Sequence, residues 1–569
     1  MPIILGLNIN HADSSACIIK DNKLVFAIEE EKLNRKKHWA GLPILAIKEC
    51  LKYANIKEEQ LTNISLNTNP LSNLPQKSIY FLKNYILGSK KREIFLRLKK
   101  KLTIKDELSR EFNFSKKIKI DYIDHHLSHI ASSYYPSNFD HAICISIDGF
   151  GDFASVVIAE GKGSKINIKE KIFFPDSLGI FYEMMTQLLG FENFGDEYKL
   201  MGLSSYGQPT YKEAILNTLF EDSKTFRLNK KYFAHTEKNF SYKFDGIPSQ
   251  NKIYKDEIFN FIKKEDIEND KENLAASIQS VYEEFFFQII KRAKELIKSD
   301  NLCLAGGCSL NSVANGKLDK SRGINKLFIP YAPGDAGGAI GSALVSSYKH
   351  QEERINNLQS PFLGPNFLEE DIKKFISTID QSRITVRKMN ESDLLEFVAK
   401  EISNSKIIGW FQGKMEFGQR ALGNRSILAD PRNKNIRDII NKKIKRRESF
   451  RPFAPSVIEN YKNEWFEFQI SNNHYMESVI KIKPDKKDIV PSVVHVDGSC
   501  RVQIVSEKTN SLFYKLINKF YDLTEVPILL NTSFNENEPI VCNIQQAYNC
   551  FYRTDMDVLV LNNFIFLKK

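Results

Sequence analysis

The chain is 569 residues long, and its 42% hydrophobic and 27% charged residues are typical of a globular protein. That length is too great for a single hydrophobic core and predicts roughly two to four domains. The formal net charge of +11 at pH 7 is compatible with an anionic substrate, a nucleic acid or an anionic membrane surface, and it does not distinguish among them.

Three classes of protein are excluded by the residue pattern. No apolar run reaches the length of about 18 residues that a membrane-spanning helix needs, and residues 1–4 lead into a strand rather than a signal peptide. The eight cysteines contain no CxxC pair, which argues against a disulfide framework and a cysteine zinc site. We therefore expect a cytoplasmic protein without a membrane span.

The same order of predicted elements occurs twice in the first part of the chain. The first copy has strands at 3–9, 16–20 and 23–28, with His11 in the turn after the first strand. The second copy has strands at 143–147, 153–160 and 166–172, with a glycine-containing turn at 148–152. Such a repeat predicts a duplicated α/β fold, by analogy the actin-like type, whose two halves face a nucleotide-binding cleft.

A basic segment at residues 90–119 carries apolar residues at helical spacing. The pattern predicts a solvated helix face, and contact with a membrane or with RNA is the alternative. No function follows from it.

The stretch 124–129, Asp-His-His-Leu-Ser-His, predicts a metal site. A spacing of four places His125 and His129 on one face of a helix, as two nitrogen ligands of one ion. Asp148, at the end of the next strand, and Asp335, just before a later helix, supply carboxylates for iron, manganese or zinc. Alternatively, the histidines cap and pack a helix and Asp335 is an N-cap.

Gly306 and Gly307 follow a predicted strand at 302–304 and precede a helix that begins near Asn311. A glycine pair in this place lets backbone N–H groups approach the phosphates of a nucleotide at a helix N-terminus. A tight turn without a ligand is the alternative.

A linker at residues 360–365 predicts a domain boundary, which we place between domains 1–355 and 356–569. Near the end of the second domain, the buried strand 526–530 is followed by Asn531 and Ser533. Polar side chains at the end of an apolar strand often line a ligand site in an α/β sheet.

Arginines of the second domain predict an anion site. Arg420, Arg425 and Arg451 lie among apolar residues and glycines, where surface solvation explains them poorly. Planar guanidinium groups suit phosphate, so several of them imply an anion with more than one charge. The basic run 442–447 is more simply a solvated surface.

These stretches together resemble the O-carbamoyltransferase family, whose members modify antibiotics and nodulation factors. The matching motifs occur in family order at residues 124–129, 147–149, 199–203, 333–338, 415–426, 451–455 and 531–535. The resemblance implies an α/β chain with two parts: a duplicated actin-like (ASKHA) N-terminal domain for carbamoyl transfer, and a C-terminal α/β domain of the threonylcarbamoyl-adenylate synthase type.

The resemblance implies an ATP-dependent enzyme of natural-product or polysaccharide biosynthesis. It would form carbamoyl-adenylate from carbamoyl phosphate and ATP with Mg²⁺, and then carbamoylate a hydroxyl of a sugar or natural product. Fe(II) or another divalent transition metal would be held by His125, His129, Asp148 and Asp335. Nucleotide would be held by Gly306, Gly307 and Asn311 in the first domain, and carbamoyl phosphate and ATP by Arg420, Lys445, Arg451, Arg501, Asn531 and Ser533 in the second.

The proton of the acceptor hydroxyl needs a base, for which His11 is the candidate, while Lys37 or His38 orients the acceptor. Arg420 and Arg451 would stabilise charge on the phosphoryl oxygens. The order of residues around His11 differs slightly from the family pattern. A homodimer is compatible with the resemblance.

Two other functions stay open. A tRNA threonylcarbamoyl-transferring enzyme would use threonine and bicarbonate, and its net charge would serve RNA. An RNA-binding protein with a vestigial nucleotide fold would bind RNA with a steep salt dependence and without ATP turnover. Because no RNA-recognition motif is present, we expect no nucleic-acid partner.

Overall fold

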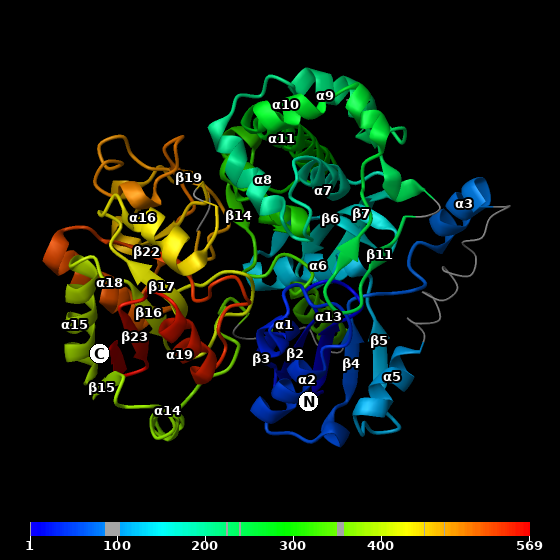
Figure 1. The fold of residues 1–569 in the computed structure, drawn as a ribbon. Helices are drawn as coiled ribbons and strands as arrows, with labels where there is room; N and C mark the ends of the chain where they lie inside the picture. The colour runs from blue at the N-terminus through cyan, green and yellow to red at the C-terminus, as the bar shows by residue number, and fades with distance from the viewer. Residues whose placement is uncertain are drawn as a thin grey trace. The chain divides into compact units, whose positions relative to one another are not determined.

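The computed structural model describes residues 2–85, 103–222, 226–237, 240–349, 355, 358–448, 450–470 and 473–569. The chain forms two compact units. Unit 1 consists of Met1–Asn34, His38–Asn311 and Ser321–Gln359; unit 2 consists of Arg35–Lys37, Ser312–Lys320 and Ser360–Lys569. Figure 1 shows most of unit 1 in blue to green and most of unit 2 in yellow to red.

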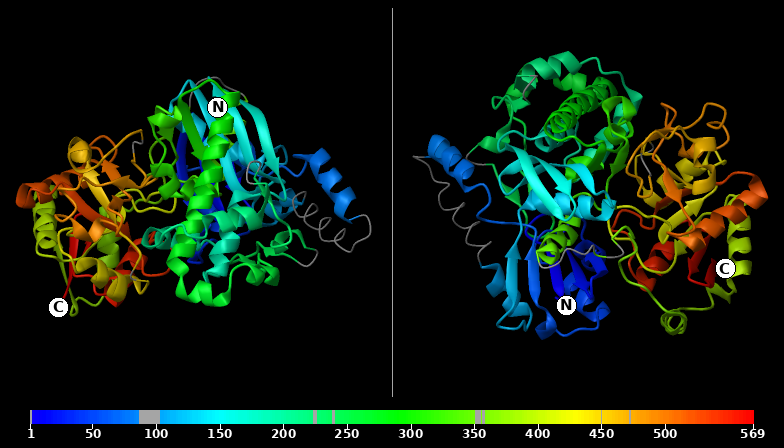
Figure 2. Two further views of the ribbon diagram at one scale, coloured as in Figure 1. Left: turned by 90° about the horizontal axis from the view of Figure 1, so that it is seen from above. Right: turned by 180° about the vertical axis from the view of Figure 1, so that it is seen from behind.

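Unit 1 contains two five-stranded sheets with the same topology, in the orders β3-β2-β1-β4-β5 and β14-β13-β6-β7-β8. In each, a central strand pairs antiparallel with the next strand of the chain and parallel with a later one. The first sheet consists of β1 (Ile4–Asn8), β2 (Ser15–Lys20), β3 (Lys23–Glu29), β4 (Asn63–Leu66) and β5 (Lys119–Tyr122). The second consists of β6 (His141–Gly151), β7 (Ala154–Lys162), β8 (Lys165–Phe173), β13 (Asn301–Ala305) and β14 (Lys326–Phe328). The predicted duplicated α/β fold is thereby confirmed, and Figure 2 shows the antiparallel strands of the second copy in cyan.

Two helices, α6 (His125–Tyr134) and α13 (Gly337–Tyr348), lie between the sheets. α13 packs against β1, β2 and β4, α6 packs against β6, β7 and β13, and the two helices pack against each other. Small residues allow this approach, since a Cβ at Gly341 would lie 1.8 Å from the carbonyl oxygen of Ser128. The N-terminus of α6 and the segment before α13 therefore meet the turns that follow β1 and β6.

The other elements of unit 1 surround this centre. The longest of the described helices is α11 (Lys271–Leu296), with 26 residues. Residues 90–102 of the predicted basic helix lie outside the described residues, and α5 (Ile104–Glu111) and β5 follow. The remaining elements are α1 (Glu30–Asn34), α2 (Ile44–Tyr53), α3 (Leu74–Tyr85), α7 (Leu178–Leu188), α8 (Glu197–Leu203), α9 (Lys212–Leu219), α10 (Lys264–Asn269), β9 (Phe220–Asp222), β10 (Arg227–Leu228), β11 (Tyr242–Lys243) and β12 (Ser249–Gln250).

Unit 2 is built on an eight-stranded mixed sheet with the order β15-β24-β23-β16-β17-β22-β18-β21. Its strands are β15 (Ile384–Lys388), β16 (Ile408–Phe411), β17 (Arg425–Ala429), β18 (Ala454–Ile458), β21 (Gln503–Val505), β22 (Ile528–Ser533), β23 (Val558–Leu561) and β24 (Phe564–Lys568), and its longer helices are α14 (Glu369–Ile376), α15 (Glu391–Ser403), α18 (Ser511–Thr524) and α19 (Ile544–Arg553). The predicted strand 526–530 extends to Ser533, because β17 pairs with its polar end. Among the described helices of both units, none has the length and hydropathy to cross a bilayer.

Candidate functional site

Two histidines of α6 face two carboxylates in unit 1. The side chain of Asp124 caps the helix, and His125 and His129 follow one turn apart, both buried. Their Nε2 atoms lie 3.0 Å from each other, and 3.1 and 2.9 Å from Asp148 Oδ2. Asp335 Oδ1 lies 3.6 and 3.4 Å from the same two nitrogens. The structure therefore brings together the four residues that the sequence suggests as metal ligands.

The separations fit a metal ion. Ligand atoms about 2.1 Å from an ion lie about 3.0 Å apart at a right angle and about 3.4 Å apart in a tetrahedron. Burial disfavours a charged imidazole, but hydrogen bonds to Asp148 and Asp335 outweigh it and raise the pKa of His129 to about 9. Burial also acts against the carboxylate of Asp148, yet His125 and His129 hold its pKa well below the usual range. The carboxylates thus favour a positive charge between the imidazoles.

His126, the middle histidine of the motif, has a structural role. Its Nδ1 lies 2.8 Å from Ser146 Oγ and its Nε2 lies 3.0 Å from the Ala154 carbonyl oxygen. Burial, together with the charge of His125, lowers the pKa of His126 to about 4, so the ring is neutral. As expected from helical geometry, it points away from the carboxylates.

Backbone groups fix the orientation of Asp148. Its Oδ1 accepts hydrogen bonds from Gly149 N at 2.8 Å and Gly307 N at 3.2 Å, which leaves Oδ2 directed at the histidines. Gly306 N donates to the Pro333 carbonyl at 2.8 Å. Both N–H groups that the sequence assigns to a phosphate are therefore engaged within the protein.

Asn311, the third residue assigned to nucleotide, pairs its side-chain amide with that of Gln279. The two amides exchange hydrogen bonds of 3.0 and 3.1 Å, and Tyr182 Oη donates to Gln279 at 2.8 Å. This network fixes the side chain of Asn311, which directly follows the short 3-10 helix Gly307–Leu310. Nucleotide binding at this turn stays a prediction.

His11, the candidate base, lies beside the histidine–carboxylate group. Its ring centroid is 4.9 Å from that of His125 and 6.1 Å from that of Phe244. The turn after β1 therefore brings an imidazole next to a residue that is more than 100 positions away in the sequence.

His38 lies near the same turn and forms an ion pair with it. His38 Nδ1 is 2.8 Å from Asp13 Oδ1. Burial acts against the charged ring, but Asp13 and Glu31 outweigh it and raise the pKa of His38 to about 9. Lys37, by contrast, groups with unit 2.

Sequence reasoning missed a set of aromatic and carboxylic side chains near His11. Tyr242 stacks on Phe244 at 5.5 Å, and its hydroxyl donates to Glu183 at 3.2 Å. Burial and the charge of Glu197 raise the pKa of Glu183 to about 8, so this pair of carboxyls retains a proton at neutral pH. These residues are scattered between positions 183 and 244, and no spacing rule connects them.

In unit 2 the predicted basic residues gather around Arg501. Burial and the neighbouring charges of Arg420, Arg447 and Arg451 lower the pKa of Arg501 well below its usual range. The guanidinium of Arg447 also lies 4.8 Å above the ring of Phe453. Four guanidinium groups held this close favour an anion with more than one charge.

Lys445 and the polar end of β22 contribute the other residues that the sequence assigns to this site. Lys445 is buried, and its Nζ donates to the backbone and side chains of Ser533 and Asn535. Asn531 Nδ2 donates to Gln503 Oε1 at 2.9 Å and to Ser456 Oγ at 3.1 Å. The assigned residues Lys445 and Ser533 therefore share one set of hydrogen bonds, and Asn531, on the same strand, belongs to a second set with Ser456 and Gln503.

Arg425 differs from the other arginines, and the expectation that it binds an anion is corrected. It is fully buried, stacks 3.6 Å from Phe411, and donates to four backbone carbonyls. The acceptors are Pro365, Gln412, Gly413 and Asn424. Through these hydrogen bonds, Arg425 stabilises the conformation of the loop before β17.

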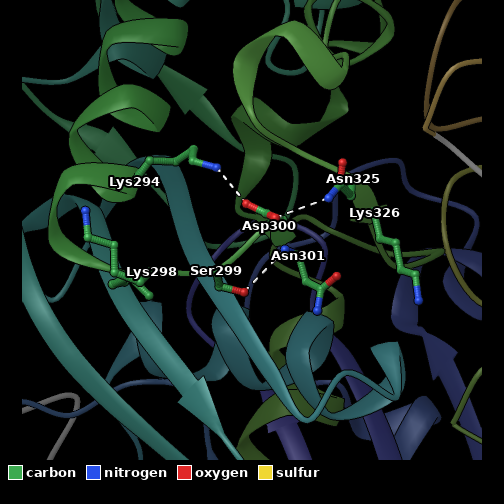
Figure 3. Close-up of a pocket in the computed structure, with 8 residues that line it drawn as sticks. Lys294, Lys298, Ser299, Asp300, Asn301, Asn325 and Lys326 are labelled. Atoms are coloured by element: carbon green, nitrogen blue, oxygen red, sulfur yellow. Dashed lines mark hydrogen bonds and ion pairs between the residues drawn. The ribbon is translucent and has the colours of Figure 1, made fainter.

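A surface pocket lies far along the second sheet of unit 1 from the histidines. Figure 3 shows it at the start of β13, whereas Gly306 follows the end of that strand. Asp300 accepts from Lys294 at 3.1 Å and from Asn325 at 3.2 Å, so its carboxylate is paired within the pocket. We assign this pocket no chemistry.

Comparisons with known proteins agree with the motifs. The family description "Carbamoyltransferase N-terminus" matches residues 3–344 and "Carbamoyltransferase C-terminus" matches residues 399–568. The chain is 36% identical over 610 residues to the uncharacterized protein sll1178 of Synechocystis, covering 100% of this chain and 97% of that protein. It is 34% identical over 573 residues to nodulation protein NolNO of Sinorhizobium fredii, covering 98% of this chain and 79% of that protein. HypF from T. kodakarensis aligns at a TM-score of 0.30 and 15% identity over 62% of this chain and 49% of that one, a likeness too weak to bear on fold or function.

Proposed function

This chain belongs to the carbamoyltransferase family, and from that premise we propose that it is an ATP-dependent O-carbamoyltransferase. It forms carbamoyl-adenylate and transfers the carbamoyl group to a hydroxyl of a sugar or natural product. The observation that carries the proposal is the convergence of His125, His129, Asp148 and Asp335 beside His11.

We assign formation of carbamoyl-adenylate to unit 2. Carbamoyl phosphate has no free carboxylate oxygen that could attack ATP. Water therefore attacks its carbonyl carbon first, phosphate leaves, and carbamate remains. A carbamate oxygen then attacks the α-phosphorus of ATP, and pyrophosphate leaves. Arg420, Arg451 and Arg501 stabilise the charge on the phosphoryl oxygens, which supports this assignment.

We assign transfer to unit 1. The acceptor oxygen attacks the carbamoyl carbon, AMP leaves, and His11 takes the hydroxyl proton. A divalent transition metal such as Fe(II), held by His125, His129, Asp148 and Asp335, would supply Lewis acidity toward the carbamoyl carbonyl. Gly307 N–H keeps Asp148 in the orientation that this ligand set needs.

The acceptor approaches His11 along the aromatic and carboxylic side chains beside it. Phe244 and Tyr242 offer ring faces, and Glu183 offers a carboxyl group for hydrogen bonds with a hydroxylated molecule. We assign the orienting of the acceptor to His38, which Asp13 holds in the same unit as His11.

The test measures pyrophosphate release from ATP in the presence and absence of carbamoyl phosphate, without an acceptor. We expect release only with carbamoyl phosphate, and His125→Gln should retain it while losing transfer to any acceptor. Arg451→Gln, the matched variant in unit 2, should lose pyrophosphate release and retain metal binding.

The proposal is wrong if carbamoyl phosphate does not stimulate release. Release driven by threonine and bicarbonate would instead support the threonylcarbamoyl reaction. If His125→Gln and Arg451→Gln each abolish both half-reactions, the division between the units fails.

A further inference from the structure

A chain of buried hydrogen bonds runs from the turn that carries His11 to the end of β4. Asn8 is fully buried at the end of β1, and its Nδ2 donates to the carbonyls of Ala12 at 2.9 Å and Asp13 at 2.8 Å. Asn67, also fully buried, donates from Nδ2 to Asn8 Oδ1 at 2.8 Å. The two amides therefore tie the His11 turn to the first residue after β4.

The orientation of both amides is determined by these bonds. If the amide of Asn8 were reversed, its oxygen would face the carbonyls of Ala12 and Asp13, and two buried acceptors would lose their donor. If the amide of Asn67 were reversed, two side-chain oxygens would face each other. Asn67 Oδ1 is itself buried and has no hydrogen-bond partner among the described residues. Because a reversal would add further unpaired buried groups, the observed arrangement is the more favourable one.

From β4 the chain continues to the first residue of α6. Asp152, in the turn between β6 and β7, accepts from Thr68 Oγ1 at 2.9 Å and from Asn69 N at 2.7 Å. Asp152 Oδ2 also accepts from His125 N at 3.0 Å. The first N–H groups of a helix have no partner within it, so this carboxylate supplies one at the helix end that carries His125.

We propose that Asn67 and Asp152 are positioning residues that hold the His11 turn against the first turn of α6. Asn67 acts on His11 through Asn8, and Asp152 acts on His125 through its backbone. Together they join the first sheet of unit 1 to the second at the level of the site and set the 4.9 Å separation of the two rings. The roles of His11 and His125 rest on the proposed function.

Two substitutions separate these actions. Asp152→Asn removes the negative charge at the N-terminus of α6 and with it the charge-assisted bond that His125 N–H donates, and should weaken binding of Co(II) to the full-length protein about tenfold. Asn67→Asp places a carboxylate against Asn8 Oδ1; it should leave Co(II) affinity within about threefold and lower kcat of carbamoyl transfer about tenfold or more, at unchanged pyrophosphate release.

Asn73→Gly is the matched control. Asn73 donates to the backbone carbonyl of Asp152 at 2.9 Å and accepts from Lys171 at 3.0 Å. It therefore holds the same turn as the proposed positioning residues, but none of its hydrogen bonds in the described part of the chain goes to Asn67 or His125. Its φ of +57° is one that glycine adopts readily. Both readouts should stay within about twofold of the wild-type values.

Hydrogen exchange of the metal-free protein distinguishes this proposal from the proposed function. Asp152→Asn should speed exchange at the first turn of α6 even if the wild-type protein transfers no carbamoyl group. Unchanged exchange and unchanged Co(II) affinity in Asp152→Asn would overturn the role of Asp152. Loss of both Co(II) binding and transfer in all three variants, with a lower melting temperature, would show that the network contributes only to stability.

Discussion

The two functional regions differ in the sign of the charge that they bury. In unit 1, Asp148 and Asp335 face two imidazoles at 2.9 to 3.6 Å, whereas in unit 2 the half-buried Arg501 lies near the guanidinium groups of Arg420, Arg447 and Arg451. Burying like charges together is unfavourable unless a partner of opposite charge binds. One region is therefore suited to a cation and the other to a polyanion, so the net charge of the chain describes neither.

The largest expected effect tests the cation side of this comparison. Asp148→Asn removes the charge that both histidines share, so metal affinity should fall more than about 100-fold, because even partners of metal ligands cost 10- to 100-fold when replaced. Carbamoyl transfer should be lost with it. A Co(II) titration against a chelator measures the affinity. Carbamoyl-phosphate-dependent pyrophosphate release should stay within about twofold, and its loss would contradict the separation.

The corresponding change on the anion side is Arg501→Gln. It should lower pyrophosphate release about 100-fold, as removal of one preorganised donor does elsewhere. Because it relieves repulsion among guanidinium groups, it should also raise the melting temperature of the ligand-free protein. An assay of carbamoyl-phosphate-dependent pyrophosphate release measures the first effect, and scanning calorimetry with and without pyrophosphate measures the second. Equal stabilisation of the wild-type protein and the variant by pyrophosphate would argue against an anion site at Arg501.

Arg425→Met tests an arginine of unit 2 that holds backbone carbonyls instead of an anion. It leaves four buried carbonyls without their donor and should lower the free energy of unfolding by about 3 kcal/mol or more. Urea denaturation measures this loss. Stabilisation by pyrophosphate should survive, and its disappearance would place Arg425 in the anion site after all.

The smallest effect concerns the carboxyl pair beside His11. The folded-state pKa of Glu183, about 8, lies above its ordinary value of 4.5, so the folded protein binds the proton more tightly. That stabilisation is complete below about pH 4.5 and is lost as the pH rises to about 8. Between pH 5 and pH 8, the melting temperature of the wild-type protein should therefore fall. The fall should exceed that of Glu183→Gln by roughly a few degrees. Parallel curves would show that the pair retains no proton.

Much of the fold follows from short-range pattern. Alternating apolar strands separated by tight turns predict both copies of the sheet, and a spacing of four places His125 and His129 on one face of α6. Such features can be predicted from neighbouring residues alone, because helix and strand periodicity determines which side chains share a face. Asp148 and Asp335 could be suggested because each stands beside the end of a strand or the start of a helix.

What could not be predicted depends on contacts between distant segments. The hydrogen bond from Gly307 N to the Asp148 carboxylate uses a backbone donor, so no particular residue type in the sequence indicates it. Arg425 and Arg501 look alike in sequence, and only the carbonyls around Arg425 distinguish them. Glu183 gains its raised pKa from burial near Glu197, which no spacing reveals. The extension of β22 to Ser533 depends on pairing with β17, which overrides the low strand preference of its polar residues.

The bond from Gly307 to Asp148 also bears on how the site tolerates genetic change. A backbone donor survives every substitution except proline, so drift in the sequence of this loop does not readily remove it. Yet a Cβ at position 307 would lie 3.0 Å from Asp148 Oδ1. The carboxylate therefore selects against side chains at the residue that orients it, and position 307 tolerates fewer residue types than its half-buried place in a short turn would suggest.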